Sequence, residues 1–407
     1  MRVVALNQFY LPDSAPTGQL LGELCEDLAA QGDDVTVITG SGTYLDKKHL
    51  AHRETIRGVR VLRLWGPSAG GTMVHRSAAY LTFWTSAAAR AATVARPDVM
   101  LSLTTPPMLS TGAASVAGAR RIPLVTWNQD VYPELSAALG VLDEQALAYK
   151  ALQGVARWAH AHTKRIVALS EGMAERIASQ GAPAERISVI PNWADGRAIR
   201  PLLPDANPFR KEHALEGRFI VMYSGNLGLA HDVTTFAGTA RQLSESSNKV
   251  LFIFSGHGQR MQEARRLTVG LPNVRFLPLQ PRERLCESLS AADVHLVSLR
   301  EGLQGLLVPS KVYGALASGR PVFYVGPAHC EVAELIRRER VGWEGRPGDE
   351  HGLAEAIRQA LESPSEHQAM SHRARDLFER RFDRQHATRR WREVLEQAAS
   401  ASAAGFG

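Results

Sequence analysis

The stretch that decides the fold runs from residue 219 to residue 232 and reads Phe219-Ile220-Val221-Met222-Tyr223-Ser224-Gly225-Asn226-Leu227-Gly228-Leu229-Ala230-His231-Asp232. Its first half is a short apolar run, which is typical of a strand buried on both faces. Two glycines then suit a tight turn, and a helix is expected to start near Asp232. Strand, turn and helix in this order predict a parallel sheet covered by helices.

The same alternation of short apolar runs and helical patterns recurs from one end of the chain to the other. The 407 residues suit two domains of roughly 100–200 residues each. We therefore predict an α/β protein with two doubly wound, Rossmann-like domains. The expected strands are Arg2–Phe9, Asp34–Gly40, Val59–Trp65, Asp98–Thr104, Pro123–Asp130, Arg165–Ser170, Ile187–Asn192, Phe219–Asn226, Val250–Gly256, Val274–Leu279, Asp293–Leu299 and Pro321–Val325.

Helices are predicted between these strands. Leucines recur on one face of Thr17–Gln31, and Gly32 stops that helix. Ser170 is a suitable N-cap for a helix over Glu171–Gln180. Pro201–Pro208 is rich in proline without periodicity, so it is interpreted as a linker between the two halves. Further helices are expected to start near Asp232, Gln259, Pro281, Pro309 and Cys330.

Composition narrows the class of protein. The net charge is +6, but no long Lys/Arg run occurs, so a nucleic-acid partner is not expected. The cysteines are Cys25, Cys286 and Cys330; their odd number and wide spacing indicate neither a disulfide framework nor a zinc site, and we expect a reducing cytoplasm. The chain enters a strand at once, so no cleaved signal peptide is expected. Residues 78–95 include Arg90 and are too polar to span a bilayer.

Open parallel sheets bind ligands beyond the carboxyl ends of their strands, so the residues that follow strands are the candidates. Glycines after the strands of the second half allow close backbone approach to a phosphate. His231 suits a phosphate donor, although a lone histidine near a helix start is more often structural. The candidate residues in these two turns are Gly225, Asn226, Gly228, Gly256 and Gly258.

A second motif is Pro309-Ser310-Lys311, placed at the start of a helix. Proline suits the first helical position. A lysine there opposes the helix dipole, and its charge becomes favourable if an anion is bound. We favour the anion over the alternative of a solvated surface lysine.

The first half offers two weaker candidates. Thr17 and Gly18 open a helix where an anion could approach, but an ordinary N-cap at Thr17 explains them and is favoured on this motif alone. Asp130 stands at a strand end before a Tyr132-Pro133 turn, where it either orients an acceptor hydroxyl or caps the turn. Pro191-Asn192 is interpreted as turn chemistry.

Several familiar motifs are missing from the sequence. It has no D-x-D, H-E-x-x-H or Walker A pattern, which indicates neither a divalent-metal cage nor a P-loop ATP site. It also lacks G-x-G-x-x-G, so no nicotinamide cofactor is indicated. We expect no cofactor and no metal.

With these motifs in order, the chain resembles glycosyltransferase family 4, of GT-B fold, over nearly its whole length. It looks closest to the bacterial subgroup that builds O-antigen, colanic-acid-like and capsular polysaccharides, including N-acetyl-fucosamine transferases. The motifs that carry the resemblance are Phe9-Tyr10-Leu11-Pro12 with Thr17-Gly18, Arg96-Pro97-Asp98-Val99 with Thr105-Pro106-Pro107, Asp130-Val131-Tyr132-Pro133-Glu134, Val189-Ile190-Pro191-Asn192, Tyr223-Ser224-Gly225-Asn226-Leu227-Gly228 and Pro309-Ser310-Lys311 through Gly319-Arg320-Pro321-Val322.

The resemblance implies a retaining transfer from a nucleotide-diphosphate sugar, expected to be UDP-linked, to a glycan or a polyprenyl-diphosphate-linked acceptor. It places the acceptor in residues 1–199 and the donor in residues 200–381, and a final helix over 382–400 is expected to return to the first domain. The catalytic candidates are Asp130 and Lys311, and the expected nucleotide-sugar contacts are Thr17, Gly18, Gly225, Asn226, Gly228, His231, Gly256, Gly258, Leu277, Pro309, Ser310 and Lys311.

The sequence departs from the family pattern in two places. The family's pair of glutamates, eight positions apart, is replaced by Leu306 and Gly314. The family's Arg and Lys after the first strand of the second domain are replaced by Asn226 and His231. These departures put the ribose contact in doubt and leave Lys311 with more of the phosphate charge.

Two other functions stay open at this point, since fold does not fix function. One is a sugar-nucleotide 2-epimerase of the same fold, and the other is a non-catalytic sugar-nucleotide-binding partner. Peripheral contact with the cytoplasmic face of the inner membrane is a further hypothesis, because residues 75–84 mix basic and aromatic side chains. A helix that packs Leu81 and Trp84 on its own sheet explains that segment equally well.

Overall fold

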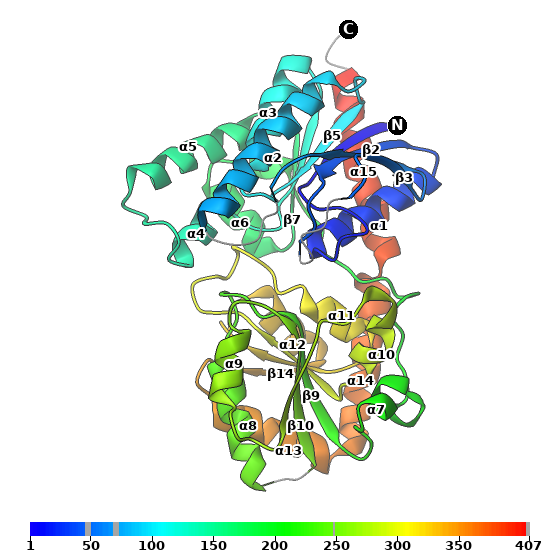
Figure 1. Cartoon of the computed structure of the whole chain (residues 1–407), viewed down its shortest axis with the longest axis vertical. Coiled ribbons are helices and arrows are strands. Elements are labelled where there is room, and N and C mark those ends of the chain that lie inside the picture. Colours follow the sequence, from blue (N-terminus) through cyan, green and yellow to red (C-terminus); the bar gives the residue numbers. More distant parts are fainter. Residues whose placement is uncertain (45–49, 68–72, 247–248, 404–407) are drawn as a thin grey trace. The chain divides into compact units, whose positions relative to one another are not determined.

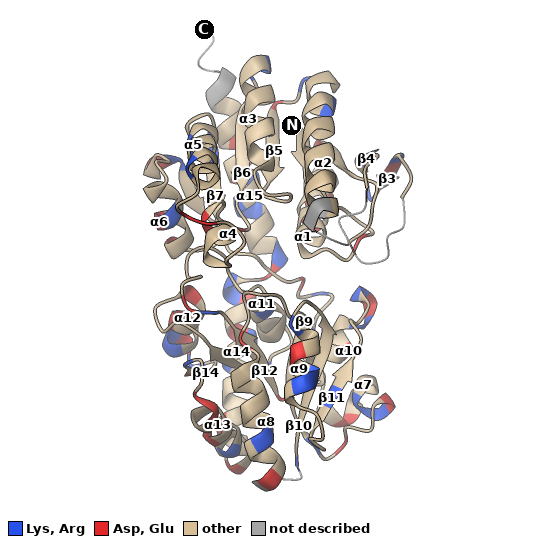
Figure 2. Ribbon diagram, turned by 60° about the vertical axis from the view of Figure 1, so that its left-hand side comes forward, with Lys and Arg blue, Asp and Glu red and all other residues tan. Residues whose placement is uncertain are grey.

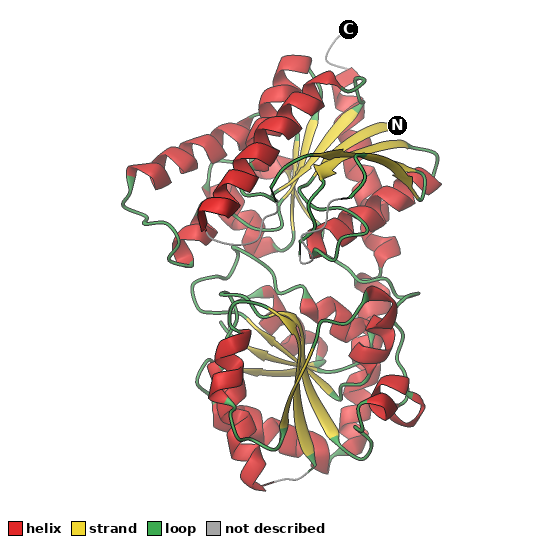
Figure 3. Cartoon of the chain, viewed as in Figure 1, coloured by secondary structure: helices red, strands yellow, loops and turns green. Residues whose placement is uncertain are grey.

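The computed structural model describes residues 1–44, 50–67, 73–246 and 249–403. The chain divides into two compact units (Figure 1). Unit 1 comprises Met1–Pro191, Gly305–Leu307 and Gln385–Gly407, and unit 2 comprises Asn192–Gln304 and Val308–Arg384. Each unit is a sheet with helices on its faces (Figure 3).

Unit 1 holds an eight-stranded sheet of order β3-β4-β2-β1-β5-β6-β7-β8. All neighbouring strands are parallel except β3, which runs antiparallel to β4 at the sheet edge. The order reverses between β1 and β5, which makes that point the topological switch of the sheet. The strands are β1 (Arg2–Leu6), β2 (Asp34–Gly40), β3 (Arg53–Ile56), β4 (Val59–Leu64), β5 (Val99–Leu103), β6 (Leu124–Trp127), β7 (Arg165–Ala168) and β8 (Ile187–Val189).

Apolar side chains cover both faces of this sheet. Val4 and Leu124 belong to a buried cluster with helices α2 and α3. Trp127 lies three positions after Leu124 on the same strand and so points to the opposite face. There its ring lies 4.6 Å from that of Trp391 on α15. The helices of unit 1 are α1 (Pro16–Ala30), α2 (Met73–Thr93), α3 (Leu109–Arg120), α4 (Glu134–Ala138), α5 (Leu147–Ala161), α6 (Glu171–Ser179) and, from its second residue on, α15 (Arg384–Ala403).

Unit 2 holds a six-stranded parallel sheet of order β11-β10-β9-β12-β13-β14. This is the 3-2-1-4-5-6 order of a dinucleotide-binding fold, and its switch point lies between β9 and β12. The strands are β9 (Phe219–Asn226), β10 (Val250–His257), β11 (Val274–Leu277), β12 (Val294–Ser298), β13 (Val322–Val325) and β14 (Gly342–Gly345).

Alternate residues of β9 enter different cores, as a strand buried on both faces requires. Val221 and Tyr223 pack with α8, α9 and α13, whereas Ile220 and Met222 pack with Phe209 of α7. Charged side chains of both signs are interspersed on the helices (Figure 2). The helices of unit 2 are α7 (Pro208–Glu212), α8 (Thr234–Ser246), α9 (Met261–Leu267), α10 (Leu285–Ser290), α11 (Lys311–Ala317), α12 (Glu331–Glu339), α13 (Glu350–Glu362) and α14 (Pro364–Arg381).

The sequence analysis missed two strands, β3 and β14. Both are four residues long and sit at sheet edges, and their sequences, RETI and GWEG, contain too few apolar residues to produce an apolar run. Several predicted strands were also too long, because an apolar run does not show where the hydrogen-bond ladder ends. The strand expected over Arg2–Phe9 ends at Leu6, and the one expected over Pro123–Asp130 ends at Trp127.

The structure tests the predicted N-caps of two helices, α6 and α1. Ser170 caps α6 as expected, since its side chain accepts a hydrogen bond from the Met173 amide. The interpretation of Thr17 as an N-cap is wrong. Helix α1 starts at Pro16 and its cap is Ala15, which makes no side-chain hydrogen bond. Thr17 instead accepts a hydrogen bond of 3.4 Å from the side-chain amide of Asn7.

Candidate functional site

The loop that follows β9 crosses the switch point of unit 2. His231 reaches from this loop to the end of β12, where its Nδ1 donates a 2.8 Å hydrogen bond to the Ser298 carbonyl oxygen. The Ser298 hydroxyl also accepts from the Asp232 amide, at 3.1 Å. Asp232 in turn accepts from the Thr235 amide at the start of α8. The loop is therefore held at the position where parallel sheets of this order bind ligands.

Lys311 meets His231 at this point. Its Nζ lies 3.1 Å from His231 Nε2 and 5.0 Å from the centre of the Tyr223 ring. Because Nδ1 of His231 carries the proton donated to Ser298, Nε2 has a free lone pair and accepts from the ammonium group. The histidine thus orients the lysine.

The charge state of this pair follows from its surroundings. Burial lowers the pKa of Lys311 to about 7. Burial, together with the neighbouring Lys311 charge, lowers the pKa of His231 to about 3, so the imidazole is neutral at pH 7. Among the ion pairs found in the described parts of the chain, none includes Lys311. A buried ammonium without a carboxylate is a favourable position for an anion.

The predicted glycine turns converge on the same strand ends. A Cβ on Gly225 would lie 3.4 Å from Lys311 Cε, so the lysine stem runs over this residue. Asn226 ends β9, and Gly228 lies against the Asn226 side chain. Gly256 and Gly258 have positive φ and face backbone carbonyls of Gly225 and Leu227. Their lack of a side chain is thus required by the packing of β9 against β10.

This packing gives a stability prediction. Gly256→Ala is expected to lower the free energy of unfolding by at least about 2 kcal/mol, because its Cβ would lie closer than 3.0 Å to the Gly225 carbonyl at a φ of +143°. Gly270→Ala is the matched control, since Gly270 also has a positive φ but no atom within 4 Å of a built Cβ. Denaturant titration of the full chain measures both variants, and equal losses would contradict the steric explanation.

The remaining predicted contacts in unit 2 are Pro309, Ser310 and Leu277. Helix α11 begins at Lys311, so Ser310 is its N-cap, without a side-chain hydrogen bond, and Pro309 precedes the helix instead of opening it. Leu277 ends the edge strand β11, two strands from β9, and packs against the apolar cluster under the sheet. At about 4.8 Å per strand, Leu277 lies roughly 10 Å from β9 across the sheet.

Sequence reasoning missed a second cation at this loop, Arg260. Its amide donates to the Leu227 carbonyl at 3.0 Å, and its guanidinium donates to the His231 carbonyl and to Glu263. Burial lowers the pKa of His257, and the nearby charge of Lys311 lowers it further. His257 lies in the second glycine turn and Arg260 follows it by two residues. A basic residue just after a glycine turn was the signal available in the sequence.

In unit 1, Gly18 lies on α1 against the loop that follows β1. A Cβ there would be 3.0 Å from the carbonyl carbon and oxygen of Phe9. Close packing of the helix on this loop is therefore sufficient to explain the glycine.

Asp130 follows β6 in a loop tied on both sides. The Gln129 amide donates to Thr104 at 3.1 Å, and the Val131 amide donates to the Leu306 carbonyl at 2.8 Å. Burial raises the pKa of Asp130 to about 6, so its carboxylate is largely ionised at pH 7 and titrates just below it. The segment Gly305–Leu307 belongs to unit 1, and Leu307 pairs with Asp130 in an isolated antiparallel bridge.

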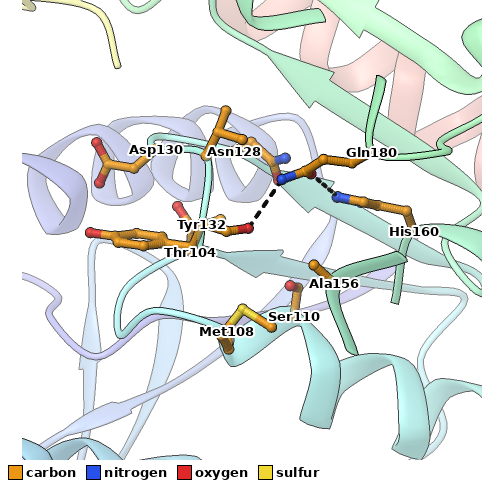
Figure 4. A pocket seen from close by; sticks show the side chains of 10 residues that line it. Thr104, Met108, Ser110, Asn128, Asp130, Tyr132, Ala156, His160 and Gln180 are labelled. Atoms are coloured by element: carbon orange, nitrogen blue, oxygen red, sulfur yellow. Dashed lines mark hydrogen bonds between the residues drawn. The ribbon is translucent and has the colours of Figure 1, made fainter. Parts of the chain in front are cut away.

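A pocket of about 340 Å³, including the part open to solvent, lies at this loop (Figure 4). The carboxylate of Asp130 and the hydroxyl end of Tyr132 lie on one side of the pocket, and His160 and Gln180 lie on the other. It is lined by Thr104, Met108, Ser110, Asn128, Asp130, Val131, Tyr132, Ala156, His160 and Gln180.

The far side of the pocket is a hydrogen-bond network that sequence reasoning missed. Burial lowers the pKa of His160, and its Nε2 lies 2.8 Å from the Gln180 side-chain oxygen, so the neutral ring donates. The Gln180 amide donates to the Tyr132 carbonyl and to Glu134. This network fixes the backbone that carries Asp130.

Two further observations bear on partners and metals. Within the described residues, no group of three His, Cys, Asp or Glu side chains is placed to hold a metal ion. No described helix combines the length and the apolar character needed to cross a bilayer.

Comparison with known proteins gives consistent matches. Residues 17–193 match the model of a glycosyl transferase 4-like domain, and residues 218–363 match that of the glycosyl transferases group 1. The chain is 28% identical to a probable glycosyltransferase, WbjE, of Pseudomonas aeruginosa, over 66% of this chain and 67% of that protein. It is 26% identical to a putative colanic acid biosynthesis glycosyl transferase, WcaI, of Escherichia coli K12, over 96% and 98%. The crystal structure of Anabaena HepE in complex with UDP-glucose aligns with a TM-score of 0.70 at 17% identity, covering 98% of this chain and 100% of HepE.

Proposed function

The chain is a glycosyltransferase of GT-B fold, with a glycosyl transferase 4-like domain followed by a group 1 domain, and we propose that it transfers a sugar from a UDP-linked donor to a glycan or polyprenyl-diphosphate-linked acceptor with retention at the anomeric carbon. We place this reaction in surface polysaccharide biosynthesis, and the name of its relative WcaI, a putative colanic acid biosynthesis glycosyl transferase, supports that role. The observation that carries the proposal is the partly buried Lys311 held by His231 at the switch point of unit 2.

The donor is assigned to unit 2 on charge. The diphosphate would accept hydrogen bonds from Lys311 and from the backbone amides of the loop after β9. His231 would keep the ammonium in place, and Arg260, paired with Glu263, would hold the loop through its bond to the His231 carbonyl. HepE holds UDP-glucose in a structure of the same fold, which supports a uridine nucleotide as the donor.

The acceptor is assigned to unit 1. Asp130 would accept a hydrogen bond from the acceptor hydroxyl and fix its approach, since an ionised carboxylate is purely an acceptor. The acceptor oxygen would form the new bond to the anomeric carbon as the bond to the diphosphate oxygen breaks. The acceptor proton would pass to the departing phosphate, and the protein would supply positioning and charge stabilisation.

Binding of the nucleotide tests the donor assignment. UDP should bind the full chain with the same affinity in EDTA and in MgCl₂, because Lys311 supplies the positive charge that a metal ion supplies in other phosphate sites. Calorimetry with and without chelator is the measurement, and EDTA followed by excess Mg²⁺ is its control. Loss of binding in EDTA that Mg²⁺ restores would contradict the metal-free site.

The acceptor class implies contact with the cytoplasmic face of the inner membrane, which we place on α2. Leu81 of this helix is 65% exposed, whereas Phe83 is buried and Trp84 donates to the Met108 carbonyl. Arg76 is one of the basic residues in the segment 75–84 from which membrane contact was predicted, and its side chain is not among those described. The helix therefore packs partly on its own sheet and leaves Leu81 free to enter a bilayer surface.

Flotation with vesicles containing anionic lipid tests this placement. Leu81→Glu should reduce the vesicle-bound fraction several-fold, since burying one leucine contributes about 1.5–3 kcal/mol. Val269→Glu is the control, because Val269 is 79% exposed and belongs to unit 2. Equal flotation of both variants and the wild type, or no flotation of any of them, would remove α2 from membrane binding.

A further inference from the structure

A second pocket lies at the carboxyl edge of the unit 1 sheet and is not used by the assignments above. It is formed after β1, β2 and β4 and encloses about 300 Å³, including the part open to solvent. Its lining includes Gln8, Phe9, Ser41, Trp65 and Phe83. We call it the Trp65 pocket.

Trp65 is the unusual member of this lining. It follows β4 directly and is 68% exposed, although tryptophan is among the residues that gain most from burial. A large aromatic ring exposed beside a pocket gives a ligand a flat apolar surface.

Gln8 supplies the polar part of the pocket. Its backbone is fixed on both sides: its amide donates to the Thr105 carbonyl at 2.9 Å, and its carbonyl accepts from the Gly40 amide at 2.9 Å. Its side chain is only 5% exposed, and the side-chain oxygen finds no hydrogen-bond partner among the described residues. A buried acceptor without a partner is destabilising, so a ligand donor at this atom would be stabilising.

These features select the chemistry of the ligand. None of the described residues that line the pocket is charged, which disfavours phosphates and carboxylates. A lipid chain would leave the Gln8 oxygen unsatisfied. A neutral sugar ring fits both parts, because its C–H face packs on an aromatic ring and its hydroxyls donate hydrogen bonds.

The Trp65 pocket lies at the same edge of the unit 1 sheet as the Asp130 pocket. β1 and β6 are both neighbours of β5, and Asp130 follows β6. At about 4.8 Å per strand, the end of β6 is roughly 10 Å from the end of β1, which Gln8 follows, and roughly 19 Å from the end of β4, which Trp65 follows. The Trp65 pocket and the Asp130 pocket therefore lie at one edge, near enough for one extended ligand to occupy both.

We propose that the Trp65 pocket binds a neutral sugar unit of the acceptor, one that does not react, with the ring stacked on Trp65 and a hydroxyl donating to Gln8. This inference rests on the proposed function in taking the ligand to be the acceptor glycan. It makes the substrate an oligosaccharide that spans two subsites.

Saturation-transfer NMR of the full chain with maltose, lactose and cellobiose, without any nucleotide sugar, tests the binding itself. We expect the wild type to transfer magnetisation to ring protons of at least one of these sugars, with unchanged intensity as NaCl is raised, because a neutral ligand is not screened. Trp65→Ala should raise the Kd at least about tenfold. Gln8→Leu should weaken binding similarly, because it removes the buried acceptor at nearly constant volume.

Trp158→Ala is the matched control, since Trp158 is 40% exposed on α5 of the same unit, outside the pocket. It should bind like the wild type, and thermal melting should confirm that the variants remain folded. Equal signals in Trp65→Ala and the wild type, no signal with any of the three sugars, or a preference for uridine at this pocket would each overturn the proposal. Because no donor is present, this result is independent of whether transfer itself is observed.

Discussion

Lys311→Met is expected to lower kcat about 10²–10³-fold while the protein stays folded. Negative charge develops on the diphosphate as the sugar leaves, and Lys311 is the cation that His231 holds at the switch point of unit 2. Methionine keeps an unbranched stem over Gly225 and beside the Tyr223 ring, so only the charge is lost. Burying that charge is unfavourable in the absence of ligand, so the variant should unfold at the same temperature as the wild type or higher.

The pH dependence distinguishes the charge from the shape of the side chain. With a pKa of about 7, Lys311 is protonated below pH 7 and loses its charge as the pH rises through that value. UDP affinity of the wild type should therefore fall above pH 7, whereas Lys311→Met should bind weakly with little dependence on pH over the same interval. Lys211→Met, which removes an exposed lysine of α7 in the same unit, serves as the control for turnover and binding. Near-normal turnover of Lys311→Met would remove this lysine from the mechanism.

Asp130→Asn is expected to slow transfer by about 10²-fold and to leave the Kd for UDP nearly unchanged. A misplaced acceptor hydroxyl costs a factor of this size, and the donor contacts come from the other unit. In the wild type, transfer should decline as the pH falls through about 6, because the Asp130 carboxylate then gains a proton and ceases to be purely an acceptor. Asp143→Asn is the control, since Asp143 lies in an exposed turn of the same unit.

The same residue gives a test of stereochemical mechanism. A double displacement would form a covalent bond between a carboxylate and the sugar, and retaining glycosidases place two carboxylates about 5–5.5 Å apart for this purpose. We expect intact-mass spectrometry after incubation with donor alone to show no added sugar. A mass increase of one sugar that maps to Asp130 would establish it as a nucleophile and contradict the positioning role.

Local patterns were sufficient for much of the fold. The apolar run after residue 218 predicted Phe219–Asn226 with the bounds that β9 has, and Asp34–Gly40 was predicted with equal accuracy. Central parallel strands are buried on both faces and therefore appear as continuous apolar runs. The edge strands Arg53–Ile56 and Gly342–Gly345 were missed because each contains too few apolar residues to form such a run.

The sequence by itself determined the α/β class, the family resemblance and the residue types at the strand ends, because period and turn chemistry are local properties. Only the tertiary structure decided which of these residues meet. His231 and Lys311 are 80 positions apart and come together across the switch point of the sheet, where Ser298 fixes the histidine tautomer. Asp130 gains its raised pKa from burial in a loop bonded to Leu306, which is more than twice as far away in sequence. Such contacts follow from the order of strands in a sheet and the burial it imposes, and neither is encoded in any short segment of the chain.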